Sequence, residues 1–172
     1  RQTVSSIEGA GSEFVITLPL ELCEERPCRG EKKYAGAREP KIKYDFSGRR
    51  VLLAEDHLLN VEVARRLLTS VGLEVEVAEN GLAAIEAFVA NPDHYYDLIL
   101  MDIRMPLMDG LTAARSIRHT EKADARSIPI VAMSANAFDE DVEKSKSAGM
   151  NEHLAKPIDP KLLCDTLARY LK

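Results

Sequence analysis

Residues 97–110 read DLILMDIRMPLMDG, an apolar run of strand length that ends at Asp102. A short apolar run bounded by turn-forming residues is typical of a strand that is buried on both faces. The Asp109-Gly110 pair that follows favours a turn before the next helix. We therefore expect a strand that leaves one carboxylate, Asp102, at its carboxyl end.

The same alternation of strand and helix continues on both sides of this run. Apolar or alternating runs predict strands at 51–54, 74–78, 97–101, 128–133 and 152–155. Helical patterns predict helices at 58–71, 81–90 and 159–170, and two more that end near 119 and 148. Because parallel strands need crossover connections, usually helices, the alternation predicts an α/β fold with helices on both faces of a parallel sheet.

The chain before this domain has a different character. Two strand-like runs lie around a glycine-containing turn in residues 1–22, which predicts a hairpin. Residues 23–48 are charged, interrupted by proline and glycine and poor in large apolar side chains, so we expect a linker there. Residues 49–172 are expected to form the main domain.

The composition excludes several classes of protein. A formal net charge of −5 and the absence of Trp argue against a nucleic-acid binder. No apolar run approaches the roughly 18–20 residues that a membrane helix needs, and no signal peptide is visible. The three cysteines have no zinc-site spacing. We therefore expect reduced thiols, a cytoplasmic location and no membrane contact by this part of the protein.

Polar side chains follow the predicted strands of the main domain. Glu55 and Asp56 follow the first strand, Asp102 the third, Ser134 the fourth and Lys156 the fifth. Open parallel sheets bind ligands at these carboxyl ends, so we expect the five side chains to converge. Clustered carboxylates repel one another unless a cation neutralises them, and Mg²⁺ prefers such hard oxygen ligands. The set predicts a Mg²⁺ site that receives a phosphoryl group.

Four separated motifs resemble the receiver domain of response regulators in two-component phosphorelays. They read VLLAED at 51–56, LILMDIRMPLMDG at 98–110, IVAMSANA at 130–137 and LAKP at 154–157. The resemblance implies a flavodoxin-like fold, which is a doubly wound five-stranded parallel sheet in the order 2-1-3-4-5 with five helices.

The resemblance also implies a role for each strand-end residue. Asp102 would accept a phosphoryl group from a phosphohistidine, and Ser134 and Lys156 would contact the transferred group. The partner would be a kinase dimerisation domain or a histidine phosphotransfer domain. The implied Mg²⁺ ligands are Glu55, Asp56, Asp102 and the backbone carbonyl of Arg104.

The sequence departs from the family pattern near Lys156 and at Glu55. His153 stands where many relatives carry an aromatic residue, so the sequence leaves open whether a switch side chain couples to Ser134. Glu55 stands where many relatives carry Asp, and its longer side chain reaches further. Pro157 is expected to fix the backbone that aims Lys156, with a cis peptide as one form.

A second resemblance lies in the hairpin region. The segments VSSIEGAGSEF at 4–14 and LPL at 18–20 resemble the last glycine box and final strands of a histidine kinase ATPase domain. Together the two resemblances imply the C-terminal part of a hybrid sensor histidine kinase. Without the other ATPase motifs, this hairpin is not expected to bind ATP.

The first helix of the main domain offers a candidate docking surface. Its sheet-facing stripe is expected to consist of Val63, Leu67, Leu68 and Val71. Leu58 and Val61 then form a neighbouring apolar patch near the acidic edge, where a phosphohistidine-bearing helical partner could dock. The alternative is that both residues belong to the edge of the buried stripe.

Other functions fit the sequence less well or stay open. A flavin-binding protein of the same topology is disfavoured because Glu55 and Asp56 would repel the flavin phosphate. A stand-alone response regulator, or a receiver that binds partners without phosphorylation, remains open. As an enzyme, the fragment is expected to show at most self-phosphotransfer and autodephosphorylation.

Overall fold

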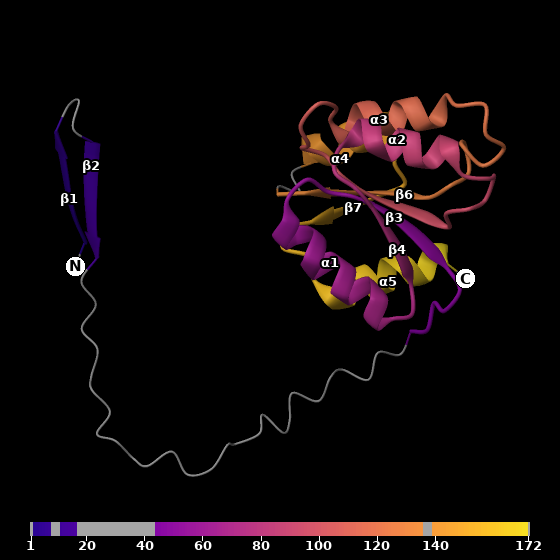
Figure 1. Cartoon of the computed structure of the whole chain (residues 1–172), viewed down its shortest axis with the longest axis horizontal. Helices are drawn as coiled ribbons and strands as arrows, with labels where there is room; N and C mark the ends of the chain where they lie inside the picture. The colour runs from indigo at the N-terminus through magenta and orange to yellow at the C-terminus, as the bar shows by residue number, and fades with distance from the viewer. Residues whose placement is uncertain (1, 8–10, 17–43, 136–138, 172) are drawn as a thin grey trace, which may run out of the picture. The chain divides into compact units, whose positions relative to one another are not determined.

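The computed structural model describes residues 2–7, 11–16, 44–135 and 139–171. The chain divides into two units, Arg1–Lys41 and Ile42–Lys172, which are described separately (Figure 1). Among the described residues, no helix combines the length and the apolar character that crossing a membrane requires.

The first unit contains the predicted hairpin. Strand β1 (Gln2–Ile7) pairs antiparallel with β2 (Gly11–Ile16), and this confirms the hairpin prediction. The apolar side chains of Val4, Ile7 and Val15 are exposed. The LPL segment at 18–20, Cys23, Cys28 and most of the predicted linker lie outside the described residues.

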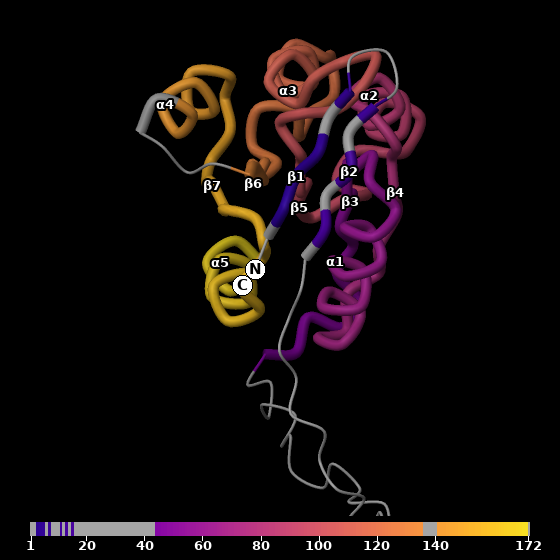
Figure 2. Tube along the Cα trace, turned by 90° about the vertical axis from the view of Figure 1, so that its left-hand side faces the viewer, coloured from indigo at the N-terminus to yellow at the C-terminus, as the bar shows by residue number. Residues whose placement is uncertain are grey.

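The second unit is built on a five-stranded parallel sheet. Its strands are β3 (Arg50–Ala54), β4 (Glu74–Ala78), β5 (Leu98–Asp102), β6 (Ile130–Ser134) and β7 (Glu152–Ala155). The strand order is β4-β3-β5-β6-β7, which confirms the predicted order 2-1-3-4-5 (Figure 2).

Five helices cover the two faces of this sheet. They are α1 (Leu58–Ser70), α2 (Gly81–Ala90), α3 (Gly110–Arg118), α4 (Asp139–Ser147) and α5 (Pro160–Tyr170). Helices α2, α3 and α4 lie on one face, and α1 and α5 lie on the other (Figure 1). Side chains of Asn80, Asp109 and Asp159 accept hydrogen bonds from the first turns of α2, α3 and α5, and so fix where these helices begin.

Alternate strand residues supply two apolar cores, one on each face. Leu52 and Ile99 pack in the core under α2 and α3, while Leu53 and Leu100 pack in the core under α1 and α5. Because both faces are buried, the central strands are continuous apolar runs. The sheet is therefore a rigid platform for the residues at its carboxyl edge.

The buried face of α1 differs from the predicted stripe. Ala64 and Leu68 are buried, whereas Val63 is 48% exposed. Val61 is half-buried and packs against the core. The placement of Val63 on the sheet face was wrong, because the small side chain of Ala64 lies at the centre of the buried stripe. For Val61 the structure shows the stated alternative, a residue at the edge of that stripe.

Two other boundaries differ from prediction. Strand β6 begins at Ile130, because the amide of Ile128 donates to the carbonyl of Asp124 in a turn, 2.8 Å. Before β3, Phe46 is only 7% exposed and its amide donates to the carbonyl of Val71. Packing of the second unit thus begins before the predicted domain start at 49.

Candidate functional site

The carboxyl edge of the sheet brings together residues from four strands. Glu55 follows β3, Asp102 and Ser134 are the last residues of β5 and β6, and Lys156 follows β7. In the register, Asp102 lies beside Met133, one residue before Ser134. Parallel pairing therefore places these polar groups at one edge, as the sequence predicted.

Lys156 links two buried carboxylates at this edge. Its ammonium nitrogen lies 2.5 Å from Oε2 of Glu55 and 2.5 Å from Oδ2 of Asp102. Glu55 is 2% exposed and Asp102 is 6% exposed. Buried charges are strongly unfavourable without a partner, so Lys156 stabilises both acids in this arrangement.

The environment shifts the pKa of both Asp102 and Lys156 upward. Burial raises the pKa of Asp102, and the opposing effects of Lys156 and the amide of Arg104 only partly offset it. Burial lowers the pKa of Lys156, but its bonds to Asp102 and Glu55 outweigh that effect and raise the pKa above its ordinary value. Lys156 is therefore a permanent cation at neutral pH.

Backbone and amide donors orient the two acids. The amide of Arg104 donates to Oδ1 of Asp102, 3.1 Å, and the side-chain amide of Asn60 donates to Oε1 of Glu55, 2.8 Å. The role of Asn60 was not predicted from the sequence. The feature that could have identified it is its position, because Asn60 is a polar residue one helical turn before Ala64, on the otherwise apolar buried stripe of α1.

The acidic residues fit a divalent cation. Glu55, Asp56 and Asp102 each offer one carboxylate oxygen, and these three oxygens lie within 4.8 Å of one another. Three carboxylates with the single ammonium of Lys156 carry two net negative charges, which a divalent ion balances. These hard oxygen ligands are the kind that Mg²⁺ prefers.

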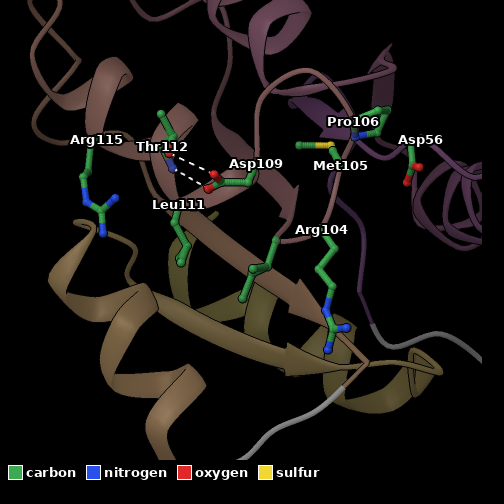
Figure 3. A pocket seen from close by; sticks show the side chains of 9 residues that line it. Asp56, Arg104, Met105, Pro106, Asp109, Leu111, Thr112 and Arg115 are labelled. Atoms are coloured by element: carbon green, nitrogen blue, oxygen red, sulfur yellow. Dashed lines mark hydrogen bonds between the residues drawn. The ribbon is translucent and has the colours of Figure 1, made fainter.

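A cavity of about 640 Å³ opens beside Asp56. Figure 3 shows its lining, which includes Arg104, the predicted carbonyl ligand, in the loop after β5. Asp109 and Thr112 line the same cavity, and Asp109 accepts hydrogen bonds from the amide and the hydroxyl of Thr112. Asp109 therefore caps α3, whereas Asp56, the other acid of the lining, belongs to the metal-binding cluster.

The backbone passes very close to Asp102 at Gly110. A Cβ atom at Gly110 would lie 2.0 Å from the carbonyl oxygen of Asp102. The amide of Gly110 also donates to the carbonyl of Ile103, 2.9 Å. The absent side chain thus allows the start of α3 to pack directly under the end of β5.

His153 contacts Ser134 directly. Nε2 of His153 lies 2.8 Å from the hydroxyl oxygen of Ser134, and the amide of Lys156 donates to the carbonyl of Ser134, 2.7 Å. The Lys156–Pro157 peptide bond is cis. The position that many relatives give to an aromatic residue is here coupled to Ser134 by a hydrogen bond.

Comparison with known proteins agrees with this geometry. Residues 51–168 match the response regulator receiver domain family. The peroxide stress-activated histidine kinase mak1 of Schizosaccharomyces pombe is 43% identical over 120 residues, 68% of this chain and 7% of the relative. Probable histidine kinase 1 of Oryza sativa subsp. indica is 32% identical over 178 residues, 86% of this chain and 18% of the relative. The chain thus spans under a fifth of either kinase.

Solved structures show the same architecture. The receiver domain of a sensor histidine kinase from Pseudomonas aeruginosa, with Mg²⁺ in its active-site cleft, is 38% identical with a TM-score of 0.66, and the match covers 73% of this chain and 98% of that one. A second match is the complex of the Saccharomyces cerevisiae phosphotransfer protein Ypd1 with the receiver domain of Ssk1. This match has 25% identity and a TM-score of 0.63, and it covers 71% of this chain and 88% of the other. With the sheet order, the acidic edge and the family match in agreement, this chain belongs to the response regulator receiver domain family.

Proposed function

We propose that this receiver accepts a phosphoryl group from a phosphohistidine onto Asp102, in a Mg²⁺-dependent step of a phosphorelay. The contact of Lys156 with both Glu55 and Asp102 carries the proposal. The buried carboxylate of Asp102 thus lies beside acids that can hold a metal ion. It also contacts Lys156, a cation that can bind phosphoryl oxygens.

Asp102 supplies the nucleophile of this step. One of its carboxylate oxygens attacks phosphorus, while the bond from phosphorus to the donor imidazole breaks and its electron pair stays on nitrogen. The product is an acyl phosphate on Asp102. Lys156 then exchanges its contact with Asp102 for one with the phosphoryl oxygens, and the Ser134 hydroxyl donates to the same group.

Mg²⁺ bound by Glu55, Asp56, Asp102 and the carbonyl of Arg104 would screen the repulsion between these carboxylates and the incoming phosphoryl oxygens. Asn60 and the amide of Arg104 hold two of the acids in place before the partner arrives. The Mg²⁺ bound in the related Pseudomonas aeruginosa receiver supports the same ligand chemistry here.

Exposed leucines border the acidic edge and form the proposed docking surface. Leu58 is 83% exposed and Leu59 is 65% exposed at the start of α1, and Leu107 is 87% exposed in the loop after Asp102. A phosphohistidine-bearing helical domain, either a phosphotransfer domain or a kinase dimerisation domain, would lay its apolar face there. The complex of Ypd1 with the Ssk1 receiver supports a partner of this kind. Val61, which packs against the core, supports the helix from beneath.

We also propose that the chain is part of a hybrid sensor histidine kinase. The rice kinase matches 86% of the chain, whereas the unit 42–172 makes up about three quarters of it, so the match extends upstream of the receiver. This supports residues 1–22 as the end of an ATPase domain and a linker from 23, followed by a receiver whose predicted start at 49 moves upstream to include Tyr44 and Phe46. The buried free thiol of Cys164 is consistent with a cytoplasmic location.

Phosphorylation is tested by incubating the chain with acetyl phosphate and Mg²⁺ and measuring its intact mass. We expect the mass of one phosphoryl group to be added, with none added in the presence of a chelator or in Asp102→Asn. Equal labelling of Asp102→Asn and wild type would overturn the assignment of Asp102. No labelling of wild type by either acetyl phosphate or a phosphohistidine protein would favour a receiver that acts without phosphorylation.

A further inference from the structure

The cavity beside Asp56 has an arginine toward each end and an apolar side chain between them. Its volume of about 640 Å³ falls within the roughly 300–1,000 Å³ of cavities that hold small ligands. Arg104 and Arg115 both line it, and Figure 3 shows Leu111 between their guanidinium groups. Leu111 and Arg115 are four residues apart on α3 and so share one face of that helix, whereas Arg104 comes from the loop after β5.

Both guanidinium groups are available to a ligand. Arg104 and Arg115 are exposed, and their hydrogen bonds in the described part of the chain are made by backbone atoms. No ion pair joins either guanidinium group to a described residue. Each arginine therefore offers its planar set of N–H donors, which matches the two oxygens of a carboxylate.

The two acids of the lining already have partners of another kind. Asp109 accepts hydrogen bonds from the amide and the hydroxyl of Thr112, at 2.8 and 3.0 Å. Burial raises the pKa of Asp109, but the hydrogen bonds from the first turn of α3 and the charge of Arg115 outweigh that effect and lower it. Asp56 belongs to the cluster that can hold a divalent cation. The charges that remain for a ligand are therefore those of the two arginines.

Apolar side chains supply much of the remaining lining. Ile103, Met105 and Leu111 are half-buried, because each packs against the core under α2 and α3 while also lining the cavity. A ligand that carried only charge would leave this apolar surface in water. A ligand that was only apolar would cover the two guanidinium groups without giving them a partner, which is unfavourable.

We propose that this cavity binds an elongated dianion with an apolar middle, of which a straight-chain dicarboxylate is the simplest example. One carboxylate pairs with Arg104 and the other with Arg115, while the methylene chain covers Leu111. This site is separate in chemistry from the phosphoacceptor, because its ligand is recognised at both ends by arginine and no group is transferred.

The test is a titration of the chain, in buffer with Mg²⁺, with straight-chain dicarboxylates from succinate to sebacate. Backbone amide shifts measured by NMR report both the affinity and the place of binding. We expect one chain length to bind best and its shifts to cluster at residues 103–106 and along α3. The monocarboxylate with the same number of carbons should bind up to about fivefold less tightly, because it pairs with one arginine at a time. Equal affinities for the two acids, or shifts spread over the whole surface, would overturn the inference.

Substitutions at the two ends test the two-ended recognition. Arg115→Gln should remove the advantage of the dicarboxylate over the monocarboxylate, and Arg104→Gln should do so from the other end. Both side chains are exposed, so we expect the fold to persist, and thermal unfolding checks this. Arg126→Gln, at an exposed arginine outside the lining, is the matched control and should keep the wild-type preference. The inference falls if Arg115→Gln or Arg104→Gln also keeps that preference, or if the control loses it.

These outcomes are independent of the proposed function. A chain that takes phosphate on Asp102 but does not prefer the dicarboxylate refutes this inference alone. A chain that binds the dicarboxylate through both arginines but takes no phosphate refutes the proposed function alone.

Discussion

The ammonium nitrogen of Lys156 lies 2.5 Å from Oε2 of Glu55, a residue 101 positions away in the sequence, and the contact joins the loop after β7 to the end of β3. The same oxygen belongs to a proposed Mg²⁺ ligand. The loop after β7 is therefore joined to the proposed metal site through one carboxylate.

Lys156→Met should destabilise the domain in the absence of Mg²⁺, because two buried carboxylates lose their partner. We expect the free energy of unfolding to fall by about 3–5 kcal/mol at neutral pH, and Mg²⁺ to restore part of it. Urea denaturation followed by circular dichroism measures both. Arg66→Met, which removes the exposed pair with Glu62, is the control and should change stability by less than about 1 kcal/mol. Similar losses in the two variants would contradict the structural role of Lys156.

The raised pKa of Asp102 predicts the sign of a pH effect without metal. The folded protein holds a proton on Asp102 more tightly than the unfolded chain does. This contribution to stability is fully present below the unfolded pKa of about 3.9 and is lost as the pH rises through the folded value. Relative to Asp102→Asn, the wild type should gain stability as the pH falls from neutral toward 4, measured by denaturation in a chelator. A relative loss over that window would show that the pKa of Asp102 is lowered instead.

Asn60→Ala should weaken Mg²⁺ binding although Asn60 is not a proposed ligand. The variant loses the hydrogen bond that orients Glu55, and we expect about a tenfold loss of affinity in isothermal titration calorimetry. Asn91→Ala is the matched control, because that side chain bonds to the carbonyl of Ala87 away from the site. Unchanged affinity in Asn60→Ala would mean that Glu55 is positioned by other contacts.

Gly110→Ala should both destabilise the domain and impair phosphorylation. The new Cβ would meet the backbone of Asp102, so β5 and α3 must separate, at a loss of about 1–3 kcal/mol or more. Gly48→Ala provides the comparison, because it has a positive φ but open space around it, and backbone strain alone costs about 1 kcal/mol. Thermal unfolding and labelling by acetyl phosphate give the two readouts. A variant at Gly110 that labels at the wild-type rate would rule out the close approach.

Leu58→Ala with Leu59→Ala should slow phosphoryl transfer from a phosphohistidine protein and leave labelling by acetyl phosphate intact. The two side chains are exposed, so the fold loses little when they are shortened, while the partner loses apolar contact. Rapid-quench kinetics with both donors measure the difference. Leu82→Ala with Val89→Ala, exposed on α2, should affect neither donor. Equal losses with both donors would mean that Leu58 and Leu59 support the site rather than the partner.

The sequence predicted the sheet and the strand-end acids because both depend on local pattern. Apolar runs such as 98–101 are typical of central strands in an α/β fold, and the residue that ends each run lies at the carboxyl edge. The family resemblance added the strand order and the role of Asp102. These predictions needed no knowledge of side-chain contacts.

The features that escaped prediction depend on contacts between distant residues. Asn60 orients Glu55 only because α1 lies over the edge of the sheet, and the bond between His153 and Ser134 requires the register of β6 and β7. Ala64 escaped because a small side chain is a weak apolar signal, although it sits at the centre of the buried face of α1. Periodicity shows which face is apolar, whereas packing decides which residue is central.

The aromatic pair before β3 bears on how this module can be exchanged between proteins. Tyr44 donates to Asp165 of α5 and stacks on Phe46, and both rings pack against the core under α1 and α5. The family match begins only at 51. A chimera joined at residue 51 would lack the two aromatic rings that pack against the core under α1 and α5. A receiver of this type that is moved into another protein should therefore begin upstream of Tyr44. In gene fusion and recombination, the segment that keeps its whole core is therefore longer than the segment that the family's sequence motifs identify.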